Sequence, residues 1–319
     1  MIIYSIVIWA AYIAADITLW PCLVIYVIST YLMVELNNRN TLMRQYSRMV
    51  SCSYMAMMLM CPWIMLSIST MAAQCCIIMV FTLLFMTYQD RSALGRKYWA
   101  YLFLGIACTI WSPLIYFLPL FWIGEASYLM SFSMRSWFAS IFGVLTPLWV
   151  LAPIQMYTGD YNWLWAMADN FVPSEKTLSS FHDVSSFLPH ELPLPAESIC
   201  IIVFVIVLML TGLIHYFRQS YTDKIQVRML YQFFSLIAIA SAVVLVLMAI
   251  LPCETQPAVD ILYATLLVCT APLLAHYVTF SSSRLTNISV IIIMLIVFGV
   301  SAYQAATDIL QSFQISINL

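Results

Sequence analysis

Apolar residues fill most of the chain in long stretches, and short polar segments separate these stretches. Residues 199–214 and 288–300 each contain only one hydroxyl side chain among apolar residues and glycine. A helix crosses the hydrocarbon core of a membrane with about 20 apolar residues, whereas a membrane barrel shows segments of about 10 residues with alternating polarity. The pattern therefore predicts an all-α fold, a polytopic bundle of transmembrane helices.

The polar breaks divide the chain into eleven candidate spans. The spans near residues 2–15 and 98–111 are short, so we expect nine to eleven crossings. We interpret residues 1–319 as a single integral membrane domain with one longer loop at about 158–197. The candidate spans lie near 2–15, 18–34, 50–69, 71–88, 98–111, 114–131, 137–157, 198–217, 229–251, 260–280 and 286–305.

Composition supports a membrane protein and excludes an ordinary soluble one. The chain is 64% apolar and 8% charged, and its mean hydropathy is +0.95. Soluble domains contain about 25% charged residues, because a surface in contact with water must be polar. The main partner expected from the composition is therefore the lipid bilayer, and nothing in the sequence indicates nucleic acid binding.

Basic residues are distributed asymmetrically between the two predicted sides of the membrane. With eleven crossings and the N-terminus inside, eleven of the twelve lysines and arginines fall on one side, and Lys176 lies in the acidic loop on the other. Basic loops face the cytoplasm, so we expect the 158–197 loop and the C-terminus outside. The asymmetry also requires residues 98–131 to cross twice. A single long helix over 2–34 would move only the N-terminus to the other side.

Cofactor and metal chemistry find little support in the sequence. The nine cysteines lack CxxC spacing, and the four histidines lack HxxxH spacing. Only Cys200 and Cys253 come near a polar loop; a disulfide between them is an alternative that we rank below free thiols. The whole chain contains seven glycines, which is few for a protein with glycine-rich phosphate-binding loops. We expect no cofactor and no metal.

Glu125 is the most unusual residue, because it lies inside an apolar stretch. A carboxyl group at membrane depth is costly and generally faces a cavity or a partner. One interpretation is a relay for protons or cations, with His276 as a companion. The other is a carboxyl group that ties helices together, or a misplaced span boundary. His215 and His276 are more typical of structural hydrogen bonding than of ligand binding.

Two basic segments, 38–48 and 219–228, show a helical pattern. In each segment two cations are spaced i, i+4, which would place Arg44 with Arg48, and Lys224 with Arg228, on one helix face. Such pairs bind anionic lipid headgroups or a polyprenyl phosphate. The accumulation of basic residues in cytoplasmic loops produces the same pattern without a specific ligand.

Four stretches next to loops carry a resemblance to a known family. They read ELNNRNTLMRQYSR at 35–48, RSWFASIFGVLTPLW at 135–149, TGDY at 158–161 and SYTDKIQVRM at 220–229. Their order and spacing resemble a family of uncharacterised multi-pass inner-membrane proteins of Bacteroidota, a domain of unknown function, from about residue 18 onward. The resemblance implies a bacterial cytoplasmic membrane location and carries no catalytic residues. Glu125 lies outside the family pattern.

Three hypotheses for function follow. The first is a non-enzymatic scaffold or accessory of the cell envelope that acts through protein partners. The second is a glycosyltransferase-like enzyme or carrier for polyprenyl-linked sugars, with Asp160 or Asp169 as the outer base. The third is a transporter or proton-translocating subunit that depends on Glu125. The absence of catalytic motifs favours the first.

Overall fold

The computed structural model describes residues 1–45, 47–159, 196–250, 256–281 and 284–317, and these residues are helical without any strand. Short 3₁₀ and π turns join or extend several of the helices. The helices are α1 (Ile2–Ala15), α2 (Trp20–Asn40), α3 (Met49–Leu59), α4 (Pro62–Met65), α5 (Ile68–Phe85), α6 (Leu94–Ile110), α7 (Leu118–Gly124), α8 (Met134–Thr158), α11 (Ala196–Gln219), α12 (Ile225–Ile250), α13 (Gln256–Phe280) and α14 (Arg284–Ile317).

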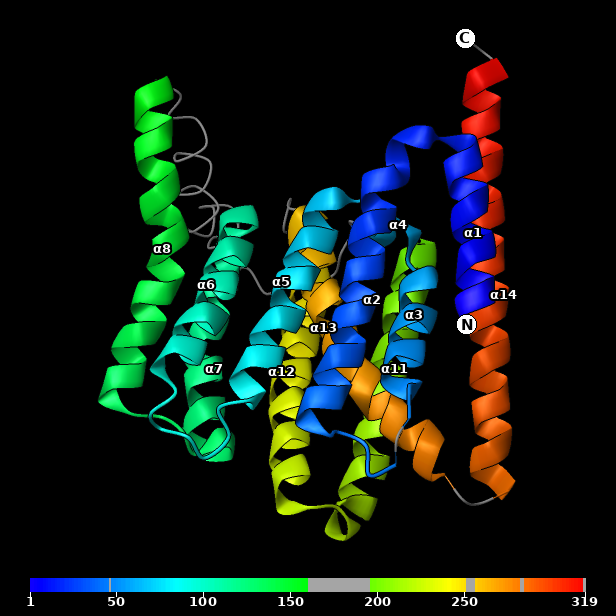
Figure 1. Ribbon diagram of the computed structural model, residues 1–319. Helices are drawn as coiled ribbons and strands as arrows, with labels where there is room; N and C mark the ends of the chain where they lie inside the picture. Colours follow the sequence, from blue (N-terminus) through cyan, green and yellow to red (C-terminus); the bar gives the residue numbers. More distant parts are fainter. Residues whose placement is uncertain (46, 160–195, 251–255, 282–283, 318–319) are drawn as a thin grey trace.

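Helix α13 forms the centre of the bundle. Within its apolar part, Val259–Phe280, the most apolar window is 89% buried inside the protein, whereas the equivalent window of α8 is only 17% buried. Helices α3, α5, α11 and α12 pack around α13. Helices α6 and α8 lie at one side of this group, and α1 and α14 lie at the other (Figure 1). The central helix is thus sealed by protein, while the outer helices keep one face free.

Seven helices in the described ranges are long and apolar enough to cross a membrane. They confirm the predicted all-α bundle of an integral, multi-pass membrane protein. The remaining predicted spans consist of shorter pieces: α1, α3 with α4, α6, and the interrupted run of residues 112–129. The total of nine to eleven crossings therefore stays a prediction.

The free faces of the outer helices are apolar. On α8, the side chains of Phe138, Phe142 and Trp149 are exposed, and on α14 those of Ile291 and Leu295 are exposed. Large contiguous apolar surfaces are rare on soluble proteins and mark a surface that contacts another apolar phase. These faces fit the hydrocarbon interior of a bilayer.

The N-terminal region is a helical hairpin that turns at Asp16. This residue is extended (φ −146°), and its carboxylate accepts hydrogen bonds from the amide and the hydroxyl of Thr18 at 2.9 and 2.8 Å. These two bonds lower the pKa of Asp16. Helix α2 returns alongside α1, so that Ser5 Oγ donates to Tyr26 Oη at 3.0 Å. The alternative of one long helix over 2–34 is therefore wrong.

Residues 94–131 leave one end of the bundle and return to it. Helix α6 ends at Trp111, which is extended (φ −142°), and a 3₁₀ turn over Ser112–Phe117 leads into α7. The ammonium group of Lys97 donates to the carbonyl oxygen of Ser131. The start and the end of this segment therefore lie side by side, whereas the double crossing of the membrane by residues 98–131 stays a prediction.

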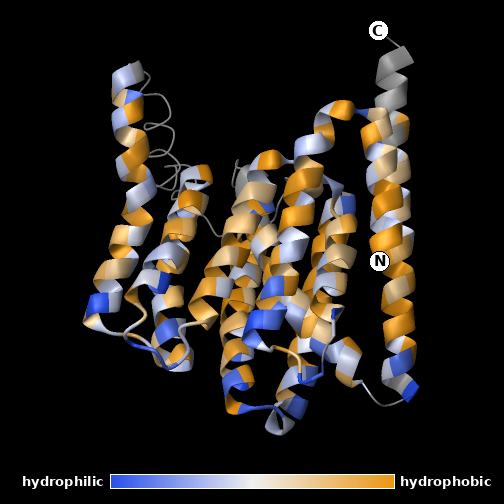
Figure 2. Ribbon diagram, viewed as in Figure 1, coloured by the Kyte–Doolittle hydropathy of each residue, from blue (hydrophilic) through white to orange (hydrophobic). Residues whose placement is uncertain are grey.

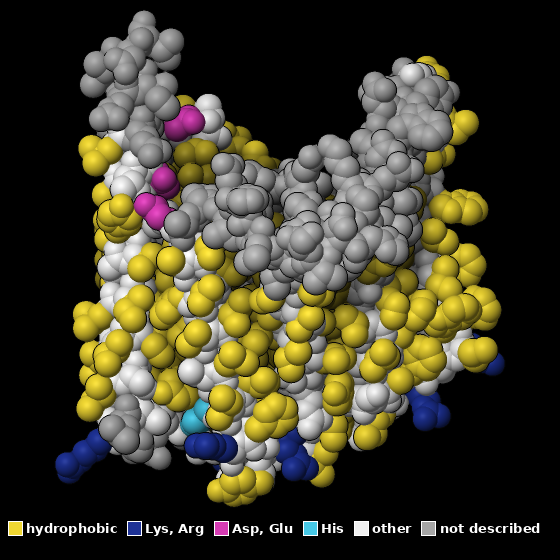
Figure 3. All heavy atoms as spheres, turned by 180° about the vertical axis from the view of Figure 1, so that it is seen from behind, with side chains coloured by type: hydrophobic (Ala, Val, Ile, Leu, Met, Phe, Trp, Pro, Cys, Tyr) yellow, Lys and Arg dark blue, Asp and Glu magenta, His cyan; other side chains and the backbone are white. Residues whose placement is uncertain are grey.

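Basic residues gather at a single end of the bundle, which we call the basic end. Figure 2 shows hydrophilic residues concentrated there, and Figure 3 shows lysine and arginine side chains at that end with acidic side chains near the other. Eleven of the twelve basic residues lie at helix ends or connections on this side: Arg39, Arg44, Arg48, Arg91, Arg96, Lys97, Arg135, Arg218, Lys224, Arg228 and Arg284. Lys176 lies outside the described residues. The predicted one-sided distribution is thus present in the fold.

Candidate functional site

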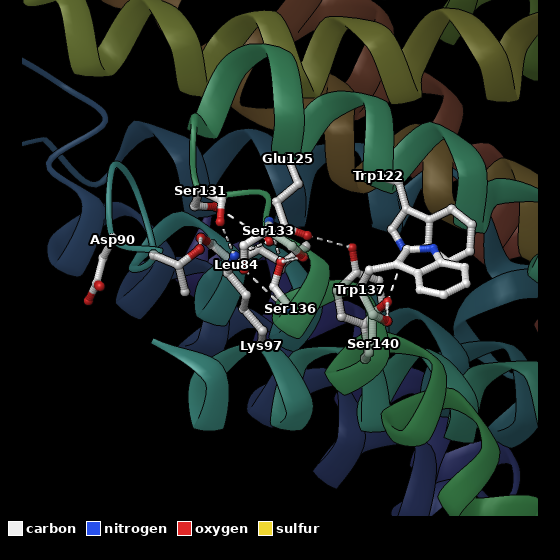
Figure 4. Close-up of polar contacts among 12 residues, drawn as sticks. Leu84, Asp90, Lys97, Trp122, Glu125, Ser131, Ser133, Ser136, Trp137 and Ser140 are labelled. Carbon is white, nitrogen blue, oxygen red and sulfur yellow. Dashed lines mark hydrogen bonds and ion pairs between the residues drawn. The ribbon is translucent and has the colours of Figure 1, made fainter. Parts of the chain in front are cut away.

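Lys97 and Glu125 form an ion pair in the interior of the protein (Figure 4). The Lys97 side chain is 0% exposed and that of Glu125 is 1% exposed. Tyr101 Oη donates to Glu125 Oε2 at 3.0 Å, and Ser131 Oγ donates to Oε1 at 3.4 Å. The ammonium group is shared between this carboxylate and the Ser131 carbonyl. Both charges and both carboxylate oxygens therefore have partners within this chain.

A local widening of the helix brings Glu125 to Lys97. After α7, residues Glu125–Leu129 form a π turn, which ends at Met130 in the left-handed region (φ 52°). The Leu129 carbonyl accepts the amide of Gln89 at 2.8 Å, which attaches the turn to the α5–α6 connection. Helices widen in this way frequently at functional sites. Here the turn aims a carboxylate at the first turn of α6.

The surroundings of the Lys97–Glu125 pair favour a structural role, in which the pair holds helices together, over a relay for protons or cations. A relay for protons or cations needs contact with water or a second titratable group that can accept the proton. Neither carboxylate oxygen of Glu125 is free, and its partners are one ammonium group, one phenol and one hydroxyl. The arrangement is the one expected for a carboxyl group that holds α6 to the α7–α8 connection.

A second buried polar cluster lies at the basic end around Asp223. One carboxylate oxygen of Asp223 is paired with Arg44, and the other lies 3.1 Å from His276 Nε2. Arg44 also donates to the hydroxyl of Thr222 and lies over the ring of Phe280, 5.0 Å from its centroid. Asp223 and His276 are each 1% exposed, whereas Arg44 is 34% exposed. This cluster joins the α2–α3 connection to the α11–α12 connection and to the end of α13.

The helical pattern predicted for residues 38–48 is wrong. Helix α2 ends at Asn40, because Thr41 adopts the left-handed conformation (φ 47°). Arg44 and Arg48 therefore share no helix face, and the Arg44 guanidinium group is directed at Asp223. The segment 219–228 is only partly helical, because a 3₁₀ turn precedes α12, which begins at Ile225.

Two histidines meet beside this cluster. The ring centroids of His215 and His276 are 5.6 Å apart, and the stacked rings of Tyr216 and Tyr231 both pack against His276. The Nδ1 atoms of both histidines are buried without a hydrogen-bond partner. Within the described ranges, no group of three histidine, cysteine, aspartate or glutamate residues is placed to hold a metal ion. The two histidines thus belong to an aromatic cluster at the basic end of the bundle.

The remaining candidates from the sequence do not converge on one site. Glu125 and His276 belong to the two separate clusters, so His276 is no companion for a relay through Glu125. Asp160 and Asp169 lie outside the described residues, as does Cys253 of the hypothetical disulfide. Cys200 is an exposed free thiol.

Sequence reasoning missed Lys97 and Asp223 as interior residues. Lys97 stands at the start of a helix next to Arg96, where a solvated cation is the usual expectation, and the signal would have been the apolar residues that follow it. Asp223 is an acid among basic residues in a short connection. Aspartate is mostly exposed and is almost never fully buried unless it is paired, so nothing in this local pattern indicated burial.

A comparison of the chain with protein families, curated proteins and solved structures finds no match. The two clusters therefore have to be interpreted from their own geometry.

Replacing Asp223 with asparagine is expected to lower the free energy of unfolding by about 1–3 kcal/mol. The change removes the charge that pairs with Arg44 and replaces one of the two acceptor oxygens, which face Arg44 and His276, with an amide donor. The partial exposure of Arg44 keeps the loss below that of a fully buried pair. Unfolding followed by tryptophan fluorescence in detergent measures the effect.

The matched control is Glu35→Gln, which removes an exposed i, i+4 pair with Arg39 at the same end of the bundle. Its expected effect is below about 0.5 kcal/mol. Equal losses for Asp223→Asn and Glu35→Gln would show that the Asp223 cluster does not hold the connections together.

Proposed function

We propose that this chain is a non-enzymatic protein of the bacterial cytoplasmic (inner) membrane, a scaffold or accessory that serves the cell envelope through partner proteins. The supporting observation is that the charged groups of the two buried clusters are paired with one another inside the protein. In both, the chain supplies its own counter-charges, and Lys97, Glu125 and Asp223 are fully enclosed. A reaction centre for a polar substrate needs charged groups that the substrate can reach.

The proposed orientation places the basic end in the cytoplasm. Eleven basic residues against four acidic ones at that end make it strongly cationic. Positively charged loops remain on the cytoplasmic side during insertion. The 158–197 loop and the C-terminus would then lie outside, where partners in surface-polymer or lipid metabolism of the envelope are found. The resemblance to inner-membrane proteins of Bacteroidota agrees with this assignment.

Native mass spectrometry of the protein purified with its own lipids tests the proposal. We expect a partner protein at fixed stoichiometry, absent when an unrelated multi-pass protein is purified in the same way, together with exchangeable bulk phospholipid. A polyprenyl phosphate or lipid-linked sugar bound at one per chain would contradict the scaffold. It would support the glycosyltransferase-like enzyme or carrier, and Asp160→Asn and Asp169→Asn would then be the variants to assay.

A transporter or proton-translocating subunit is the second candidate, because the structure shows a charged pair inside the bundle. Lysine and glutamate side chains within membrane segments mark proton paths in many transporters. Under this alternative, Glu125→Gln abolishes ion or proton flux in proteoliposomes. Unaltered flux, or the absence of flux in the unmodified protein, leaves the pair with a structural role.

A further inference from the structure

His276, in the Asp223 cluster, can take up a proton only at a buried atom. The Asp223 carboxylate only accepts hydrogen bonds, so its contact of 3.1 Å requires that His276 Nε2 carries the hydrogen. The neutral ring therefore has a lone pair at Nδ1. This atom is buried and has no hydrogen-bond partner among the described residues. A second proton on the ring would create a buried N–H group without an acceptor, which is costly.

The neighbouring rings do not supply that acceptor. The ring centroid of His215 lies 5.6 Å from that of His276, and the Nδ1 atom of His215 is likewise buried without a partner in the described ranges. The two Nδ1 atoms thus form no hydrogen bond with each other. The other rings against His276 are those of Tyr216, Tyr231 and Phe280, with centroids at 5.6, 5.4 and 4.8 Å. The closed cluster therefore surrounds His276 with aromatic carbon.

The charges around His276 also oppose a second proton. Attraction to Asp223 favours the protonated ring, but Arg44 already neutralises this carboxylate. One carboxylate between two cations leaves a buried charge without a partner, which is costly. Helices α3, α4 and α5, which also pack against α13, carry no charged side chain. The titratable and charged groups that the other neighbouring segments bring to the cluster are Arg44, His215, Tyr216, Asp223, Arg228 and Tyr231.

Displacement of the α11–α12 connection removes both obstacles. Asp223 lies in this connection, Arg44 lies in the α2–α3 connection, and His276 stands one turn before the end of α13. Once these segments separate, water can reach the ring, and a solvated histidine has a pKa of about 6.5. Below that pH the open arrangement binds one proton more than the closed arrangement. By linkage, a falling pH therefore favours the open arrangement, and a pH above about 7 favours the closed one.

We propose that His276 makes the basic end sensitive to pH: the neutral ring keeps the α11–α12 connection closed, and a proton on His276 releases it. This device is regulatory and does not depend on whether the chain is a scaffold or a transporter. With the basic end in the cytoplasm, as in the orientation proposed above, it responds to acidification of the cytoplasm.

Hydrogen–deuterium exchange of the full chain in nanodiscs measures the release. The amides of Asp223 and Arg228 donate to the carbonyls of Ser220 and Lys224, each at 3.0 Å, so peptides across the α11–α12 connection report the breaking of these bonds. After correction for the intrinsic exchange rate at each pH, we expect the opening equilibrium constant to rise about tenfold between about pH 7.5 and 5.5, the effect of one additional proton. The α5–α6 connection is the reference and should change by less than about twofold.

The decisive variant is His276→Gln, because the glutamine amide can still donate to Asp223 but takes up no proton. We expect its rise to be less than about twofold. The matched control is His182→Gln/His190→Gln, which removes the two histidines outside the described residues and should keep the full rise. If His276→Gln fails to fold, the variant His182→Gln/His190→Gln/His215→Gln retains His276 as its one histidine and has to show the full rise.

An opening equilibrium that does not change with pH in the unmodified protein would overturn the proposal, as would a full rise in His276→Gln. Loss of the rise in the variant that retains only His276 would also overturn it, because the proton would then belong to another histidine. An equal rise in the α5–α6 reference would show acid unfolding of the whole chain in place of a local release, and this too would contradict the proposal.

Discussion

Replacing Lys97 with methionine lowers the free energy of unfolding by about 3–5 kcal/mol. The substitution preserves most of the side-chain volume and removes the ammonium group, so Glu125 is left as a buried carboxylate with only Tyr101 and Ser131 as donors. Removing one partner of a buried pair is costly because the other remains desolvated without its counter-charge. Unfolding by heat or denaturant in detergent, with the ten tryptophans as reporters, measures the loss.

A double-mutant cycle tests whether Lys97 and Glu125 stabilise the protein as coupled partners. If the pair has a structural role, Lys97→Met/Glu125→Leu recovers most of the stability lost in either single variant. An apolar pair of similar volume then fills the site without a buried charge. The control is Arg39→Met, which breaks an exposed pair and is expected to cost below about 0.5 kcal/mol. A double variant as unstable as the two single losses added together would contradict the account of Lys97 and Glu125 as coupled partners.

The helical membrane class could be predicted because it depends on composition and length, which are properties of each segment alone. The gathering of basic residues at one end of the bundle could be predicted for the same reason, because it depends on where the loops fall along the chain. The predicted helix boundaries were less accurate where the backbone conformation of a single residue ends a helix. Thr41 ends α2 in the left-handed conformation, and the turn between α3 and α5 falls at residues 60–67, earlier than the break expected near residue 70.

The polar clusters could not be predicted, because each partner is chosen by packing across the bundle. Arg44 and Asp223 are 179 residues apart in sequence, and Asp223 and His276 are 53 apart. Nothing in the local pattern of either residue specifies the other. Glu125 stood out as a carboxyl group in an apolar stretch, but its partner Lys97 could equally have been a solvated residue at a helix start. The partners of the buried charged residues can be identified only from the folded structure.

Gly105 and Gly143 allow α6 and α8 to approach backbone to backbone. A Cβ atom on Gly105 would lie 2.6 Å from the Val144 carbonyl oxygen, and one on Gly143 would lie 2.8 Å from the Tyr98 carbonyl oxygen. Small residues permit such close contact between membrane helices, where packing is a main source of association energy. Helix α8 packs chiefly on α6, so this contact determines whether α8 stays docked.

We expect Gly105→Ala and Gly143→Ala each to destabilise the protein by about 1–3 kcal/mol, because the methyl group meets main-chain atoms that move only if the helix moves. Gly95→Ala on the same helix is the control: nothing lies within 4 Å of its Cβ position. That substitution is expected to be neutral or stabilising by up to about 1 kcal/mol, since alanine loses less backbone entropy in a helix. The unfolding midpoints of the three variants measure how far the stability of the protein depends on each glycine. Similar midpoints for all three would mean that α8 does not depend on close contact with α6, whereas a loss confined to Gly105→Ala and Gly143→Ala would locate the attachment of α8 at these two glycines.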